Sequence, residues 1–246
     1  IISQYISAAL VLRLLLCSEE SFALRKENLH IDRLILRRVL RIGIPSALQY
    51  ALFAVANLFV QTSVNYFDHV MVEGNSAAAN ADPLVYDMMA AFYTACTSFI
   101  AQNMGAKERE RILKSYFICM LYSFGLGLFL GVGIYLLRYP FLSMFTSEKT
   151  VVDAGIRRLS VMALSYCVSA FMDCSIAASR GLGRTIVPMF IVTAGSTVFR
   201  LLWIWTVFAH YRTIESLYLL YVFSWTITGI AEMIYFAKTM KAVRFS

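Results

Sequence analysis

The sequence has few charged residues. Asp, Glu, Lys and Arg make up only 15% of its 246 residues, whereas a soluble domain has about a quarter. This composition excludes a water-soluble globular domain. The net charge of +7 does not indicate a nucleic-acid-binding protein, because the basic residues occur in short clusters between apolar segments rather than on one patch.

Motifs for catalysis and metal binding are also scarce. The three histidines lie far apart in the chain, and no Ser/His/Asp arrangement indicates an enzyme. No CxxC spacing is present, so we expect neither disulfides nor a metal site, and no cofactor. The five cysteines are interpreted as small apolar packing residues: Cys17, Cys96, Cys119, Cys167 and Cys174.

Long apolar segments are abundant. Hydrophobic residues make up 59% of the chain, and its mean hydropathy is +0.67. Crossing a bilayer takes about 20 mainly apolar residues, and continuous runs of that length predict helices rather than barrel strands. The sequence therefore predicts an all-α, polytopic membrane helix bundle with six transmembrane helices: Ile42–Phe67, Pro83–Gly105, Ser115–Leu137, Leu159–Ser179, Thr185–Tyr211 and Ser216–Ala237.

The chain divides into three predicted parts. Ile1–Leu16 is interpreted as the end of a preceding transmembrane helix rather than a signal peptide, because no charged segment precedes it. Residues 17–41 form a predicted basic linker in the cytoplasm, and residues 42–246 form a predicted C-terminal six-helix lobe. Of the basic residues outside the spans, 15 lie on the linker side and 5 on the other, which predicts a cytoplasmic C-terminus.

Four glycines occur in the third span: Gly125, Gly127, Gly131 and Gly133. A phosphate-binding loop is not expected inside a charge-free apolar helix. Small residues spaced by four allow helix backbones to approach closely in membranes. We therefore predict that Gly127 and Gly131 face a neighbouring helix.

Asp173 is the clearest candidate for a functional residue. An ionised Asp at the centre of a membrane helix costs about 2.5–3.5 kcal/mol on insertion scales. Ser169 lies four residues earlier on the same helical face. A carboxylate that only fixes helix packing is the alternative, but a hydroxyl would do this at lower cost, so we favour a substrate or ion site.

Two further polar faces are candidates for a cavity lining. Gln49, Asn57 and Gln61 follow one helical face of the first span, which predicts a wet cavity or a contact with another helix bundle. Tyr86 and Tyr93 line one side of the next span.

Arg200 and Glu232 are the remaining candidates. Arg200 has no acid in its own span, so we expect a carboxylate or a cavity anion as its partner, or else an ion pair that fixes helix packing. Glu232 lies six residues before Lys238, so it either contributes to the cavity or extends to the cytoplasmic interface.

Several segments together resemble the C-terminal half of the multidrug and toxic compound extrusion (MATE) transporters. Their order and spacing, rather than any one motif, carry the resemblance. The segments are Gly43-Ile44-Pro45 with Val64-Asn65-Tyr66-Phe67, Gly74–Asn80 followed by Gln102–Ala106, and Arg180–Gly183 followed by Arg200–Ile204.

The resemblance implies an exporter of two six-helix lobes that alternates access around a central cavity, driven by a proton or sodium gradient. The missing partner would be an N-terminal six-helix lobe of the same chain, with the lipid bilayer and a small organic substrate as the other partners. Better-known branches carry acids where this sequence has Phe53 and Ser169. Asp173 lies one turn after Ser169 on the same face and is interpreted as the substitute for the acid that is missing at position 169.

Three functions remain open at this point. The main hypothesis is a cation-coupled antiporter that exports amphipathic organic compounds or drugs across the cell membrane. A flippase for lipid-linked oligosaccharides would need a strongly cationic cavity. A non-transporting membrane subunit would use the polar faces only for packing.

Overall fold

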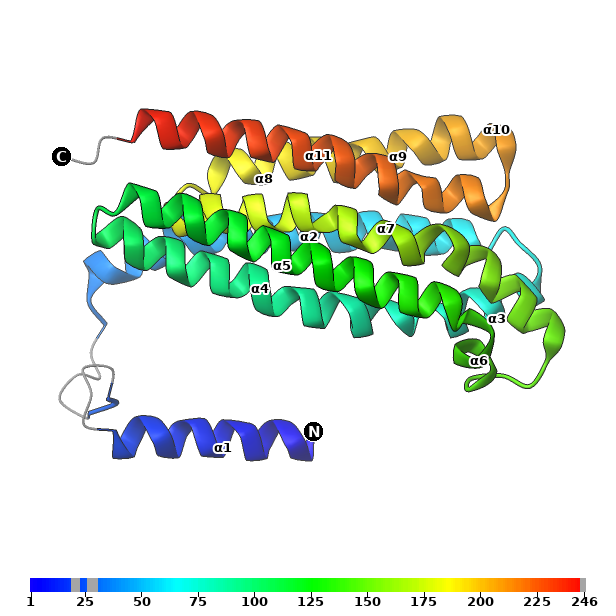
Figure 1. The fold of residues 1–246 in the computed structure, drawn as a ribbon, viewed down its shortest axis with the longest axis horizontal. Coiled ribbons are helices and arrows are strands. Elements are labelled where there is room, and N and C mark those ends of the chain that lie inside the picture. The colour runs from blue at the N-terminus through cyan, green and yellow to red at the C-terminus, as the bar shows by residue number, and fades with distance from the viewer. Residues whose placement is uncertain (19–22, 26–30, 244–246) are drawn as a thin grey trace. The chain divides into compact units, whose positions relative to one another are not determined.

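The computed structural model describes residues 1–18, 23–25 and 31–243 of the chain, and these form helices without a strand (Figure 1). They divide into two compact units, residues 1–41 and 42–246. The first unit contains α1 (Ile2–Cys17) and the first turns of α2 (Arg33–Val64). Parts of the predicted linker, residues 19–22 and 26–30, and the C-terminal residues 244–246 lie outside the described residues.

The second unit contains the remainder of α2 and the other helices. Within the described residues, six helical segments are long and apolar enough to cross a membrane, which confirms the predicted fold class. Besides α2, the elements of this unit are α3 (His69–Ala78), α4 (Ala81–Gly105), α5 (Arg109–Leu136), the short α6 (Arg138–Ser143), α7 (Lys149–Gly181), α8 (Ile186–Val192), the π-helix η2 (Thr193–Val198), α9 (Phe199–Trp203), the π-helix η3 (Ile204–Phe208), α10 (Ala209–Tyr211) and α11 (Ile214–Ala242).

Three helices begin at least six residues earlier than the hydropathy pattern predicts. Helix α2 begins at Arg33 rather than Ile42, α5 at Arg109 rather than Ser115, and α7 at Lys149 rather than Leu159. The predicted spans started where charged residues stopped, but Arg and Lys are good helix formers and do not end a helix. The helices therefore extend beyond the apolar segments.

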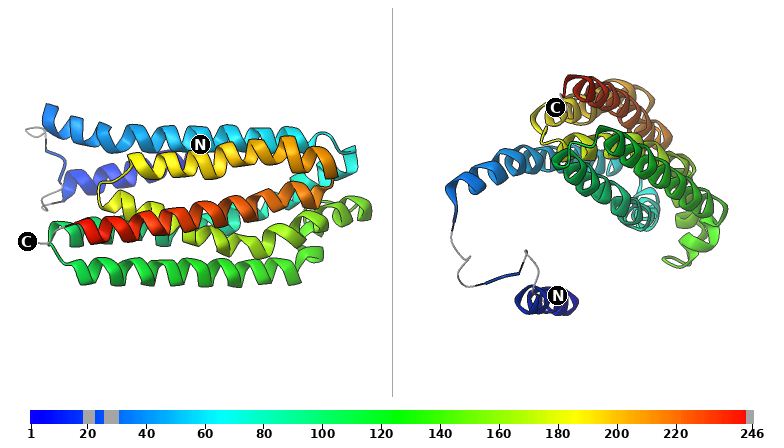
Figure 2. Two further views of the ribbon diagram at one scale, coloured as in Figure 1. Left: turned by 90° about the horizontal axis from the view of Figure 1, so that it is seen from above. Right: turned by 60° about the vertical axis from the view of Figure 1, so that its left-hand side comes forward.

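Helix α7 is the central helix of the second unit. It packs against α3, α4, α5 and α11, and it is buried over most of its length (Figures 1 and 2). Many of its buried residues are Ala, Ser or Gly, which let neighbouring backbones approach. At one such contact, a Cβ on Gly74 would lie 2.7 Å from the Cβ of Ala154. This central position explains why α7 is the most buried of the six membrane-spanning segments.

The predicted glycine contact is confirmed. A Cβ on Gly131 would collide with the backbone oxygen of Ala163 in α7, and one on Gly127 would lie 3.2 Å from the Cα of Cys167. Gly125 and Gly133 have open space at the same position. The spacing of four therefore marks the face of α5 that packs on α7.

We expect Gly131→Ala to destabilise the protein, because its methyl group has no room unless α5 and α7 separate. Overpacking of this kind costs about 1–3 kcal/mol. The check is the melting temperature of the detergent-solubilised full-length protein. Gly133→Ala makes the same change on the open face and should leave the melting temperature unchanged or raised. Equal effects of the two substitutions would contradict the packing argument.

Candidate functional site

A cavity of about 450 Å³ lies between α2, α4, α7 and α11. Its lining is aromatic and polar, with few aliphatic side chains. The lining residues are Tyr50, Phe53, Asn57, Val60, Gln61, Ala79, Asp82, Tyr86, Tyr93, Arg158, Met162, Met172, Asp173, Tyr218, Tyr221 and Trp225. Apolar walls with a few polar groups are typical of small-molecule sites.

Aromatic side chains on three helices contact one another along the cavity wall. The ring of Tyr86 on α4 lies edge-on to Tyr166 of α7, with centroids 5.4 Å apart, and to Trp225 of α11 at 6.0 Å. Tyr221 lies 5.3 Å from Trp225. These pairs fix the rings, so the wall offers a firm surface on which flat or cationic organic groups can stack.

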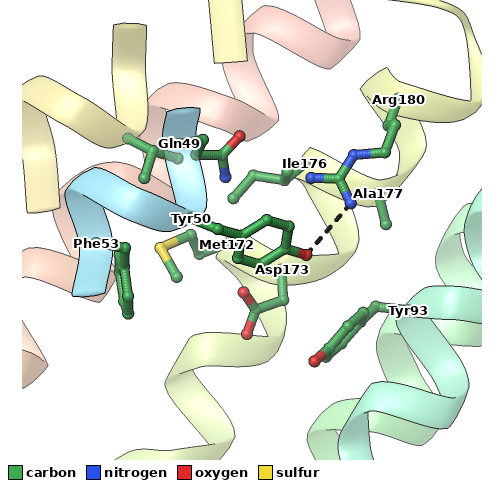
Figure 3. Close-up of a pocket in the computed structure, with 10 residues that line it drawn as sticks. Gln49, Tyr50, Phe53, Tyr93, Met172, Asp173, Ile176, Ala177 and Arg180 are labelled. Carbon is green, nitrogen blue, oxygen red and sulfur yellow. Dashed lines mark hydrogen bonds between the residues drawn. The ribbon is translucent and has the colours of Figure 1, made fainter. Parts of the chain in front are cut away.

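A smaller cavity of about 90 Å³ shares several of these residues and brings in Gln49 and Arg180 (Figure 3). The side chains of Tyr50, Asp173 and Tyr93 converge on it from α2, α7 and α4. Arg180 donates a long hydrogen bond to the Tyr50 hydroxyl, at 3.4 Å. This contact connects α2 to the end of α7 beside the cavity.

Asp173 lines both cavities and has no Lys, Arg or His nitrogen within 4.0 Å among the residues that the structure describes. It is half-buried. A carboxylate in such a place, with its charge not offset by an ion pair, favours the binding of a cation.

The cavity's second acid, Asp82, is held very differently. Arg158 Nη2 lies 2.5 Å from one of its carboxylate oxygens, and the Tyr166 hydroxyl donates to the other, also at 2.5 Å. Arg158 also donates to the backbone oxygen of Asn75 at 2.9 Å, and Tyr218 donates to the Asn75 side chain. Asp82 is therefore neutralised by protein groups, whereas Asp173 is not.

Sequence reasoning missed this network. Asp82 and Arg158 each directly precede a predicted span, Pro83–Gly105 and Leu159–Ser179, so the sequence places both outside the spans. The pair is separated by 76 residues in the chain, so no local pattern connects the two. The one available signal was the pair of arginines at 157 and 158 next to an apolar span.

Six of the nine predicted site residues line the two cavities. Asn57, Gln61, Tyr86, Tyr93 and Asp173 line the larger cavity, and Gln49 lines the smaller one with Tyr93 and Asp173. The other three, Ser169, Arg200 and Glu232, are fully buried and line neither cavity.

Arg200 lies behind the cavity wall. Its guanidinium stands 4.5 Å from the ring centre of Phe53 and 4.4 Å from that of Tyr221, and it donates to Asn57 Oδ1 at 2.8 Å and to Ser224 Oγ at 3.2 Å. No carboxylate of the described chain lies within 4.0 Å, so the expected acid partner is wrong. Amide, hydroxyl and aromatic groups stabilise the charge instead.

Glu232 does not extend to the membrane interface. The side chain is fully buried, and neither carboxylate oxygen has a hydrogen-bond partner among the described residues. The alternative that placed it at the cytoplasmic surface is wrong. Glu232 lies in α11, which packs along α7 and against α8 and η2.

These features define a polytopic membrane protein with a cavity of aromatic and acidic lining between its helices. The chain belongs to the MatE family, whose model matches residues 45–206. Members of this family are transporters and not enzymes.

Two relatives are described as probable multidrug resistance proteins. They are NorM of Thermotoga maritima, 22% identical over 195 residues, and YoeA of Bacillus subtilis, 23% identical over 199 residues. Each match covers 78% of this chain and 41% of the relative. The chain thus spans less than half the length of these relatives.

Solved structures share the fold. A variant of the Vibrio cholerae MATE transporter VcmN superimposes with a TM-score of 0.80 at 20% identity, and covers 91% of this chain and 51% of VcmN. A MOP superfamily transporter from Pyrococcus furiosus superimposes with a TM-score of 0.85 at 18% identity. This match covers 98% of this chain and 55% of the transporter. Its binding pocket is described as having reverse polarity, which suggests a different function for that protein.

Proposed function

We propose that this chain is the C-terminal lobe of a cation-coupled antiporter that exports amphipathic organic compounds across the cell membrane by alternating access. The observation that carries the proposal is Asp173, an acid without an ion pair in a cavity lined by aromatic rings. Membership of the MatE family and the description of two relatives as multidrug resistance proteins support it.

The mechanism rests on competition for Asp173. A proton, a sodium ion or a cationic substrate would each lower the free energy of the carboxylate, and only one can do so at a time. Tyr93 and Tyr50 stand beside it and would stack against an organic substrate. The coupling ion would bind from the side on which the substrate is released, and it would leave on the opposite side after the protein reorients.

The proposal includes a partner and a topology. An N-terminal six-helix lobe of the same chain would close the open side of the cavity. The excess of basic residues on one side of the spans supports a cytoplasmic C-terminus.

The cavity composition disfavours a flippase for lipid-linked oligosaccharides. A diphosphate head requires excess positive charge, but Arg158 is paired with Asp82, and Arg200 is covered by Phe53 and Tyr221. Asp173 adds a negative charge. A role limited to helix packing is disfavoured by Gln61, which lines the cavity and is exposed.

Dye efflux tests the proposal. Cells that express the full-length protein are expected to export a cationic fluorescent dye, and export should stop when the proton and sodium gradients are both collapsed. Collapsing one gradient at a time identifies the coupling ion. Export that continues without either gradient would refute ion coupling, and absence of export from energised cells would refute the transport function.

A further inference from the structure

Helix α11 presents three polar residues at intervals of four to the span that contains η2 and α9. Ser224 Oγ accepts a hydrogen bond from Arg200 Nε at 3.2 Å, and Thr228 Oγ1 lies 3.2 Å from Ser196 Oγ. The two helices are antiparallel. A residue four positions later on α11 therefore faces a residue four positions earlier on the other helix. The third residue of this face is Glu232.

The same register places Val192 opposite Glu232. Val192 is apolar and 1% exposed, so it offers no hydrogen-bonding side chain. Glu232 is 0% exposed, and both of its carboxylate oxygens lack a hydrogen-bond partner among the described residues. A buried, unpaired carboxylate costs several kcal/mol when ionised.

Among the residues that the structure describes, no Lys, Arg or His nitrogen lies within 4.0 Å of the Glu232 carboxylate. Neither α8 nor η2 contains an ionisable residue. On α7, Asp173 and Arg180 line the cavities, and Cys174 is fully buried. Arg200 on α9 bonds Ser224, eight residues away from Glu232, which is about 12 Å along the helix.

A proton is the ligand that fits this place. A metal cation needs a shell of several oxygen ligands, and the residues around Glu232 provide no hydrogen-bonding group to it. Only a proton removes the charge without such a shell. The π-helix η2 begins directly after Val192, and π-helical segments are frequent at functional sites.

We propose that Glu232, which lines neither cavity, is a second proton-binding site in the interface between α11 and the α8–η2 segment. It is a neutral carboxylic acid while these helices are packed. When they separate and water enters, the acid transfers its proton to water and the carboxylate remains. The inference rests on the proposed transport function and adds a coupling group that does not contact substrate.

The test uses the full-length protein in proteoliposomes, with substrate affinity and efflux driven by an imposed pH gradient measured side by side. Glu232→Gln keeps the shape and cannot ionise. We expect its substrate Kd to stay within about two-fold of the wild type and its pH-driven efflux to fall at least about ten-fold. The protons exchanged per substrate should fall by one.

The matched control is Thr228→Val, which removes a polar group from the same face without removing an ionisable one. It is expected to keep wild-type pH-driven efflux. Glu232→Asp retains an acid and should retain pH-driven efflux. It therefore tests the proposal if Glu232→Gln does not fold.

The results separate the two proposals. If the wild type transports and Glu232→Gln keeps unchanged pH-driven efflux, the second proton site is overturned. A large change in the substrate Kd of Glu232→Gln also overturns it, as does a folded but inactive Glu232→Asp. Wild-type efflux driven by sodium alone also overturns it, while the transport function stands. A wild type without any efflux refutes the transport function itself.

Discussion

Replacing Asp173 with Asn in the full-length protein is expected to abolish gradient-driven dye efflux, with a fall of at least about ten-fold. An interaction free energy of about 1.4 kcal/mol suffices for a ten-fold change. On membrane insertion scales, an ionised Asp at the centre of a helix costs about 2.5–3.5 kcal/mol, which exceeds this value. The carboxylate of Asp173 has no ion pair that would offset this cost. The amide keeps the shape of the side chain but cannot bind a proton or neutralise a cation. Initial efflux rates, normalised to the amount of protein in the membrane, provide the measurement.

Asp87→Asn is the matched control. Asp87 lies on α4, is exposed, and lines neither cavity, so its substitution removes the same charge without affecting the site. It should leave efflux at the wild-type rate. Unchanged efflux in Asp173→Asn would exclude this carboxylate from coupling, and an equal loss in both variants would indicate a general effect of charge.

The fold and part of the site could be predicted from the sequence because they depend on local patterns. Apolar length alone gives six membrane helices, and the spacing of Gly127 and Gly131 gives the α5 face that packs on α7. The face of α2 with Asn57 and Gln61 was also predictable, because residues four apart on a helix point the same way. Asp173 stood out through the energetic cost of its position.

What the sequence could not provide is the pairing between helices. Arg158 reaches Asp82 across 76 residues, and Arg200 reaches Asn57 across 143. Contacts over such separations follow no local helical periodicity, so no sequence pattern predicts these pairs. Glu232 shows the same limit: its separation from Lys238 suggested access to the interface, but the packing of α11 on α7 and α8 decides its burial.

Arg157 and Arg158 are adjacent in sequence, but we expect very different effects when each is replaced with Met. The side chain of Arg158 is 6% exposed and holds Asp82 and the Asn75 backbone. Its removal leaves the Asp82 carboxylate, which is 29% exposed, without its cation. Breaking a fully buried pair costs about 3–5 kcal/mol, which sets the upper bound for this partly buried one. Arg157 pairs with Glu215, where the two side chains are 49% and 41% exposed. Exposed pairs contribute about 0–1 kcal/mol.

The melting temperature of the detergent-solubilised full-length protein tests this difference. Arg158→Met should lower it strongly, and Arg157→Met should leave it almost unchanged. Adding Asp82→Asn to Arg158→Met should restore part of the loss, because the double variant no longer contains a partly buried, unpaired charge. Losses that simply add would mean that Asp82 and Arg158 act independently, and the short contact between them would then have no energetic weight. Since both residues line the substrate cavity, recovery of stability without recovery of dye efflux would show that the pair also shapes the site.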